Sequence, residues 1–287
     1  MTAVAGVDPG VPAAERDTGT VLRKLMLELS LGDIRLPSFP DIAARVQKVL
    51  DDPKTSPARV AVVVGSEAAL AARIIRLANS AFLNPSGEQV NDLRVALTRL
   101  GVQLVRCTAV SFALQQMKLG GNDAALRPQL QQLWRDGALV ASIAYVLARE
   151  TRAANPDEAL VTGLMHNIGK LYITLNSARG STAAVHDEAW SKAVREWHPQ
   201  VAVLILKHWK FPPAIIAAVG NPGGGGLSDI LEAATVLVPC VFDRALMPEI
   251  VAAVPAFAEL HLDAEGCTRI LAASAEQIRS LRAGLSD

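Results

Sequence analysis

The stretch GLMHNIGKLY, from Gly163 to Tyr172, is the part of the sequence that decides the fold. On a helix, His166 and Lys170 are four residues apart and share one face. Gly163 and Gly169 have no side chain, so a neighbouring helix or a ligand can approach the backbone closely. A single histidine in an apolar helix is most often structural, and the surrounding sequence has to decide between a structural role and a functional one.

Apolar residues around this stretch recur at spacings of three and four, which is typical of helices that bury one face. Leu22, Leu25, Met26 and Leu29 follow this pattern. No stretch alternates apolar and polar residues between hairpin turns, so the sequence predicts an all-α protein. Capping and turn residues predict helices at 41–50, 68–81, 93–100, 129–151 and 156–164, with further helices from 188 onward. Another helix is predicted to begin at Pro57, after the capping residue Ser56. Gly101 is expected to end or break the helix at 93–100.

Composition narrows the class of protein. The 287 residues include 28 Lys+Arg and 28 Asp+Glu, and 51% are hydrophobic, which excludes a disordered chain and a strong global positive field. Cys107, Cys240 and Cys267 lack paired spacing and are interpreted as buried thiols of a cytoplasmic protein. The N-terminus lacks the features of an export signal, and no apolar run is long enough to span a membrane.

Local composition also suggests how the chain is divided. Residues 1–20 are expected to form a flexible tail. Gly, Asn, Asp and Pro gather at 119–128, which predicts a boundary between a helical part at 21–118 and a second part at 124–287. The NPGGGG segment at 221–226 is expected to be a flexible loop.

GLMHNIGKL resembles the HD(I/L)GK signature of the HD metal-dependent phosphohydrolase superfamily. Further stretches resemble, in order and approximate spacing, the HDOD family, the HD-related output domain: LPSFPDIAARVQKVLDDP, IIRLANSAFL, VALTRLGVQLVR, LWRDGALVASIAYVLA and WHPQVAVLILKHWKFP. This resemblance covers about residues 21–282. It implies one HDOD domain, in which an N-terminal helical subdomain packs on a degenerate HD-like helical bundle.

In HD hydrolases a cluster of His and Asp side chains holds metal ions that activate water. The resemblance places the corresponding positions of this chain at Asp136, His166, Asn167, Lys170, His198, Gly220, Asn221 and Thr235. Most of them lack the expected ligand, above all Asn167, where the signature has an aspartate. Neither a metal, nor a cofactor, nor a catalytic residue is therefore expected.

The resemblance implies a catalytically inactive module of bacterial signal transduction that acts through protein–protein contacts. The expected partner is a separate protein, such as a sensor kinase, a response regulator or a cyclic-dinucleotide enzyme. Membrane and nucleic-acid partners are not expected. Candidate ligand or partner contacts are Trp134, Arg135, Trp197, His208 and Trp209.

Four alternatives remain open from the sequence. The remnant pocket could sense a nucleotide or another anion through His166 and Lys170. Asp136, His166, Asn167 and His198 could form an altered hydrolase centre, or His166, His198 and His208 a transition-metal site. The arginines at 73, 76, 94, 99 and 106 could bind nucleic acid, although solvated arginines are the default expectation.

Overall fold

The computed structural model describes residues 27, 41–80, 83–84, 86–116, 127–177, 188–221, 223–242 and 248–286. These residues form helices, a short 3-10 segment and connections, and none of them lies in a strand. The all-α prediction is therefore confirmed. The expected tail and most of the expected boundary at 119–128 lie outside the described residues. No helix in the described ranges is long and apolar enough to cross a membrane.

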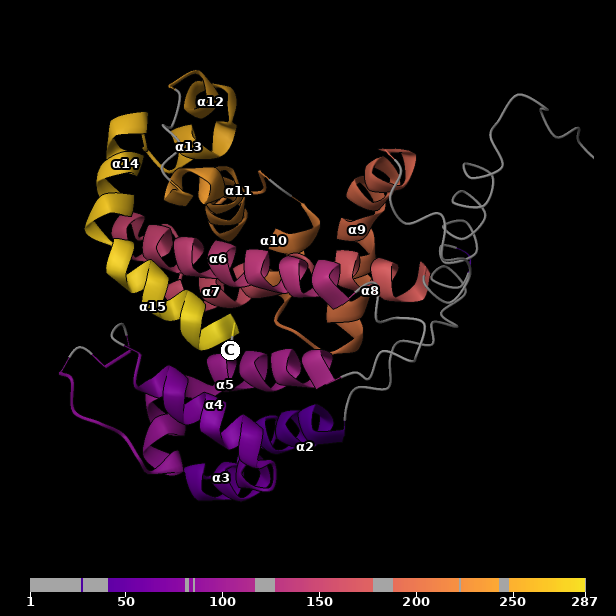
Figure 1. Cartoon of the computed structure of the whole chain (residues 1–287), viewed down its shortest axis with the longest axis vertical. Coiled ribbons are helices and arrows are strands. Elements are labelled where there is room, and N and C mark those ends of the chain that lie inside the picture. Colours follow the sequence, from indigo (N-terminus) through magenta and orange to yellow (C-terminus); the bar gives the residue numbers. More distant parts are fainter. Residues whose placement is uncertain are drawn as a thin grey trace, which may run out of the picture.

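An N-terminal group of helices occupies one end of the molecule (Figure 1). It consists of α2 (Asp41–Leu50), α3 (Pro57–Gly65), α4 (Ala68–Ala78) and α5 (Leu93–Gln116). The start of α3 follows the predicted chemistry, because the Ser56 side chain accepts a hydrogen bond from the Arg59 backbone N–H at 3.3 Å and Pro57 takes the first helical position. The helix predicted at 68–81 ends at Ala78, three residues earlier than expected.

Helix α5 is broken at Gly101, as predicted. The backbone there has φ 71° and ψ 168°, a combination open in practice only to glycine. A Cβ on Gly101 would meet nothing within 4 Å. The glycine is therefore required by the backbone conformation of the break and not by close packing.

The remaining helices form a bundle at the other end (Figure 1). They are α6 (Arg127–Thr151), α7 (Pro156–Met165), α8 (Ile168–Ser177), α9 (Glu188–His208), α10 (Pro213–Gly220), α11 (Leu227–Leu237), η2 (Val238–Phe242), α12 (Pro248–Ala253), α13 (Pro255–Glu259), α14 (Ala264–Ala273) and α15 (Ala275–Ser286). Helices α6 and α7 pack closely at Gly163, where a Cβ would lie 2.5 Å from the Cα of Ala141. This confirms the expectation that Gly163 admits a neighbouring helix.

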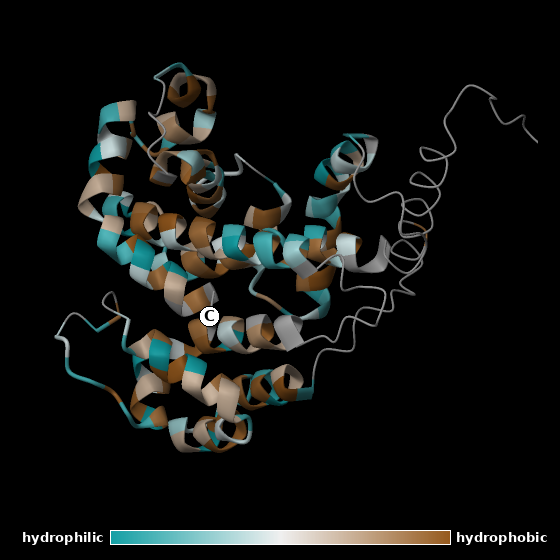
Figure 2. Ribbon diagram, in the orientation of Figure 1, coloured by the Kyte–Doolittle hydropathy of each residue, from teal (hydrophilic) through white to brown (hydrophobic). Residues whose placement is uncertain are grey.

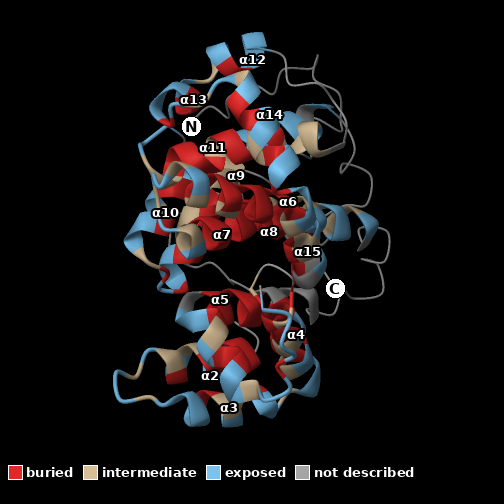
Figure 3. Cartoon of the chain, turned by 90° about the vertical axis from the view of Figure 1, so that its left-hand side faces the viewer, coloured by how far each residue is buried: buried red, intermediate tan, exposed pale blue. Residues whose placement is uncertain are grey.

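Both groups of helices bury apolar side chains. Helix α4 buries Leu70, Ile74 and Leu77, and α6 buries Ile143 and Leu147. Each such side chain stabilises the fold by about 1.5–3 kcal/mol relative to an exposed one. Buried residues concentrate on α6, α7 and α11 (Figure 3), which pack on one another, and hydropathic colouring places brown segments at the same helices (Figure 2). Cys107 and Cys267 are buried as predicted, whereas Cys240 is half-buried.

Helix α15 forms hydrogen bonds with helices of both groups. Near its end, the Leu285 carbonyl accepts a hydrogen bond from the Arg73 guanidinium of α4 at 2.8 Å and from the Trp134 indole of α6 at 3.2 Å. A second link joins α2 to the turn after α9, where the Gln47 side-chain amide donates to the Trp209 carbonyl at 2.6 Å. The C-terminal turn thus lies between the N-terminal helices and the bundle (Figure 1).

Candidate functional site

The central motif does not form one helix. Helix α7 begins with Asn155, whose side chain accepts hydrogen bonds from the backbone N–H groups of Asp157 and Glu158, and it ends at Met165. Helix α8 then starts at Ile168. His166 and Asn167 therefore form the connection between two helices, so His166 and Lys170 do not share one helix face, and both His166 and Asn167 lie at a buried corner.

His166 is held as a neutral imidazole. It is 9% exposed, and its Nδ1 lies 2.6 Å from the Gly163 carbonyl oxygen. Because a carbonyl only accepts, Nδ1 carries the proton and Nε2 keeps a lone pair. The pKa of His166 is lowered to about 4, chiefly by burial; the hydrogen bond to Gly163 opposes this shift, and the charge of Lys170 adds to it.

Asn167 stands where the HD signature has an aspartate. It is 4% exposed, and its side-chain oxygen, Oδ1, has no hydrogen-bond partner. A buried amide oxygen without a partner costs about 1–3 kcal/mol. The position is therefore polar, neutral and unsatisfied.

His198 joins the corner from α9. The close approach of α8 to α9 occurs at Gly169, where a Cβ would collide with the His198 carbonyl oxygen. Burial lowers the pKa of His198 to about 3, and the neighbouring Lys170 and His166 contribute to the same shift. Its Nδ1 is buried without a hydrogen-bond partner. Both histidines are consequently uncharged at neutral pH.

Lys170 supplies a positive charge next to them. Burial lowers its pKa, while Asp136 of α6 raises it and Arg195 of α9 lowers it. The Asp136 carboxylate accepts a hydrogen bond from the Gln132 side chain at 2.8 Å. Lys170 acts electrostatically on His166 and His198, and Asp136 acts on Lys170. Together with Asn167, which follows His166 in the chain, we name Asp136, His166, Lys170 and His198 the remnant cluster. Sequence reasoning did not single out Arg195, which is three residues before His198 on α9.

The remaining carried-over positions make other contacts. Gly220 ends α10 against Val203, whose Cγ2 would lie 2.5 Å from an added Cβ. Asn221 is exposed, and a Cβ added to Gly224 in the glycine-rich loop would lie 3.2 Å from its side-chain nitrogen. Thr235 is exposed on α11 and its hydroxyl donates to the Leu231 carbonyl at 2.9 Å. The register predicted for these three positions remains a prediction.

Two of the residues predicted as ligand or partner contacts are buried. Trp134 is 6% exposed and Trp209 is 3% exposed, so neither indole is accessible to a partner. Arg135 and His208 are exposed, and Trp197 is half-buried. The three-histidine metal site is wrong, because His198 and His208 lie ten residues apart on α9, about 15 Å at 1.5 Å per residue.

Two of the five arginines considered for nucleic-acid binding are buried and engaged within the protein. Arg73 is 3% exposed and bonded to the Leu285 carbonyl. Arg106 is 8% exposed and forms an ion pair with Asp51 at 2.7 Å. The default expectation of solvated arginines is wrong for these two, because both stabilise contacts between helices.

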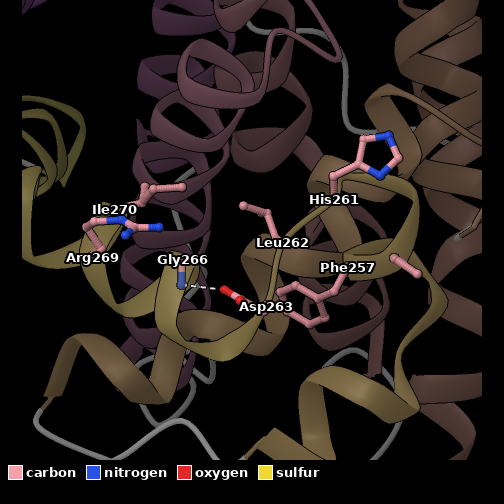
Figure 4. A pocket seen from close by; sticks show the side chains of 8 residues that line it. Phe257, His261, Leu262, Asp263, Gly266, Arg269 and Ile270 are labelled. Carbon is pink, nitrogen blue, oxygen red and sulfur yellow. Dashed lines mark hydrogen bonds between the residues drawn. The ribbon is translucent and has the colours of Figure 1, made fainter.

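A separate recess of about 470 Å³ lies between α13 and α14 (Figure 4). Phe257, Leu262 and Ile270 give it an apolar lining. The Asp263 carboxylate accepts a hydrogen bond from the Gly266 backbone N–H at 2.7 Å, so it is engaged in capping α14. None of the residues predicted for the site lines this recess.

The remnant cluster does not fit the metal centre that the HD signature implies. No group of three or more His, Cys, Asp or Glu side chains in the described residues is arranged to hold a metal ion. Hard divalent cations favour carboxylate oxygens, and Asn167 offers only a neutral amide oxygen. Lys170 would repel a cation at the same place. The chemistry available is hydrogen bonding and attraction of negative charge.

An all-helical bundle with an HD-type histidine at the α7–α8 corner defines an HD-related domain. A model of the HDOD domain family matches residues 36–222, well over half of the chain. The chain therefore belongs to the HDOD domain family. A comparison with curated proteins gives no match.

Solved structures share this fold. A protein of Shewanella amazonensis SB2B, provisionally called a metal-dependent phosphohydrolase, has a TM-score of 0.74 and 24% identity over 94% of this chain and 99% of its own. An HDOD domain protein of unknown function from Geobacter sulfurreducens has a TM-score of 0.62 and 21% identity over 95% and 98%. A protein of Marinobacter aquaeolei VT8, provisionally called a signal transduction protein, has a TM-score of 0.56 and 21% identity over 96% and 66%. At these identities the likeness shows the fold alone.

Proposed function

We propose that this HDOD domain is a non-catalytic signalling module that acts through contacts with a partner protein. The observation that carries the proposal is Asn167, a buried neutral amide at the position of the metal-binding aspartate. Next to it, two neutral histidines and the Lys170 cation replace the negative cluster that a divalent ion needs. Membership of the HDOD family supports a signalling role. A sensor kinase, a response regulator or a cyclic-dinucleotide enzyme remains the expected kind of partner.

The proposal predicts purified protein without metal and without phosphoesterase activity. The protein is incubated with Mn²⁺, Fe²⁺ and Zn²⁺, dialysed and measured by elemental mass spectrometry, and its hydrolysis of a chromogenic phosphodiester is followed. His166→Ala is the matched control, and we expect its metal content and turnover to equal those of the wild type. Near-stoichiometric metal that His166→Ala loses, or turnover that this variant abolishes, would contradict the proposal.

A second candidate function is sensing of an anionic small molecule by the remnant cluster. The specific observation is that Asn167 Oδ1 and His198 Nδ1 are buried without partners and that the charge of Lys170 acts on His198. A ligand that completes these hydrogen bonds and carries negative charge would remove the cost of leaving them unsatisfied.

This candidate predicts thermal stabilisation by such a ligand. Inorganic phosphate, adenosine monophosphate and a cyclic dinucleotide are tested separately, because ligand bound only to the folded state raises its stability, by about 2.7 kcal/mol at 100 times Kd. Lys170→Met is expected to abolish the rise in Tm, whereas Lys192→Met, at an exposed position on α9, preserves it. Equal shifts in both variants would place the ligand elsewhere.

A further inference from the structure

The first turns of α5 expose an apolar side chain between two cations. A shallow, open depression of about 420 Å³ is lined by Arg94, Val95, Thr98 and Arg99, and we name these four residues the α5 surface. Their spacing places them on one side of the helix. Val95 is 50% exposed, which leaves a large apolar area in water.

Other exposed valines lie on α5 and on the helix that packs beside it. Val102, just after the break at Gly101, is 50% exposed. On the neighbouring α3, Val62 is 75% exposed. The two helices meet where a Cβ on Gly65 would lie 3.7 Å from Leu93. The N-terminal helices thus expose three valines, and Val95 is the one that lies between two cations.

The cations of the α5 surface can engage a new partner. The Arg94 guanidinium lies 3.4 Å from the Asp92 carboxylate, and both side chains are largely exposed at 64% and 48%. Such a surface pair contributes about 0–1 kcal/mol, so a partner carboxylate can replace Asp92 at little cost. Arg99 donates through Nη1 to the Ala78 carbonyl at 3.3 Å, a contact that leaves its positive charge without a carboxylate among the described ion pairs.

The distribution of charged residues along the chain indicates what kind of partner segment fits the α5 surface. Residues 41–116 contain nine Lys and Arg against six Asp and Glu, whereas residues 127–286 contain 14 against 15. The excess of positive charge thus belongs to the N-terminal helices that carry the α5 surface. An acidic segment complements it in charge, and an aliphatic side chain of that segment can cover Val95.

We propose that the α5 surface docks an acidic, amphipathic helix of a partner protein. An aliphatic side chain of that helix packs on Val95, and its carboxylates pair with Arg94 and Arg99. This inference rests on the proposed function, since it names the surface through which the module meets its partner.

The experiment uses the full chain and a labelled helical peptide that combines glutamates with leucines at a spacing of four. Its twin carries lysine in place of every glutamate. Fluorescence anisotropy is expected to give saturable binding of the acidic peptide and none of the twin. Binding should weaken as NaCl is raised, because salt screens exposed charges over about 10 Å at 0.1 M.

The variants Val95→Asp and Arg94→Glu are expected to raise Kd about tenfold or more, as loss of a central contact does. Val95→Asp should not unfold α5, because it puts a carboxylate in the first turn of the helix, where the helix dipole favours it. Ile250→Asp is the matched control. Ile250 is 44% exposed on α12, at the opposite end of the molecule (Figure 1), and its substitution should leave Kd unchanged.

Equal binding of the twin, unchanged Kd in Val95→Asp, or absence of saturable binding would overturn the proposal. A dimer that Val95→Asp dissociates in sedimentation would assign the surface to a second copy of the chain. Duplex DNA that displaces the acidic peptide and binds more tightly would assign it to nucleic acid. None of these results bears on metal content or turnover, so failure here is distinct from failure of the proposed function.

Discussion

At the scale of single residues, the α7–α8 corner shows how burial sets protonation. Burial and the charge of Lys170 both disfavour the protonated form of His166, while the hydrogen bond from Nδ1 to the Gly163 carbonyl partly offsets them. An unfolded histidine binds a proton below about pH 6.5, whereas folded His166 stays neutral down to about pH 4. Between these values protons favour the unfolded state, so acid should destabilise the fold.

We therefore predict that the free energy of unfolding falls as the pH is lowered from 7 to 4, with up to about 3 kcal/mol of the loss due to His166. His166→Asn removes the titrating group but keeps a donor for the Gly163 carbonyl. Urea titrations across this range should show a flatter pH dependence for this variant. His208→Asn, on the exposed end of α9, should follow the wild type. The same slope in all three proteins would contradict the prediction.

At the scale of helices, glycines decide how closely neighbouring elements pack. A Cβ at position 163 would lie 2.5 Å from the Cα of Ala141 and 2.7 Å from its backbone nitrogen. Backbone atoms cannot yield as a flexible side chain does, so α7 would have to move away from α6. The position of the remnant cluster depends on this contact, because His166 follows α7 directly.

Gly163→Ala is expected to lower the free energy of unfolding by about 1–3 kcal/mol, the usual cost of overpacking. Gly65→Ala is the matched control, because its Cβ would make only an ordinary contact of 3.7 Å with Leu93. That variant should be neutral or stabilised by about 0.5 kcal/mol through lower backbone entropy in the unfolded chain. If Gly163→Ala and Gly65→Ala changed the free energy of unfolding equally in chemical denaturation, the prediction that close packing makes Gly163 the more sensitive site would be contradicted.

At the scale of the whole molecule, one carbonyl joins three helices. Leu285 of α15 accepts from Arg73 of α4 and from Trp134 of α6. If either donor is lost, the other still satisfies the carbonyl. If both are lost, a carbonyl at a buried position is left without these partners, and the cost of that group is added.

We predict that Arg73→Met and Trp134→Phe together destabilise the protein by about 1 kcal/mol more than the sum of the single variants. Hydrogen exchange in α15 should accelerate most in the double variant. Arg279→Met, which removes an exposed ion pair with Glu276, should change stability by less than about 1 kcal/mol. Additive effects of the two buried substitutions would mean that the shared carbonyl does not couple the helices.

The sequence by itself determined the all-helical class, the HDOD family and several boundaries, because these depend on local signals. The start of α3 at Pro57 after Ser56 and the break of α5 at Gly101 follow from capping chemistry and backbone preference within a few residues. The family motif likewise marked His166, Asn167 and Lys170 as a unit, since they are close in sequence.

Only the tertiary structure decided which side chains are buried and which distant residues meet. Trp134 and Trp209 are of a residue type common at protein interfaces, but both are buried in the core. Arg73 donates to the carbonyl of Leu285, which is 212 positions away in the sequence. His198 and Arg195 join the cluster because α8 approaches α9 at Gly169. Helical periodicity marks an apolar face, but it does not specify which neighbour covers that face, because contacts between distant segments depend on how the whole chain packs.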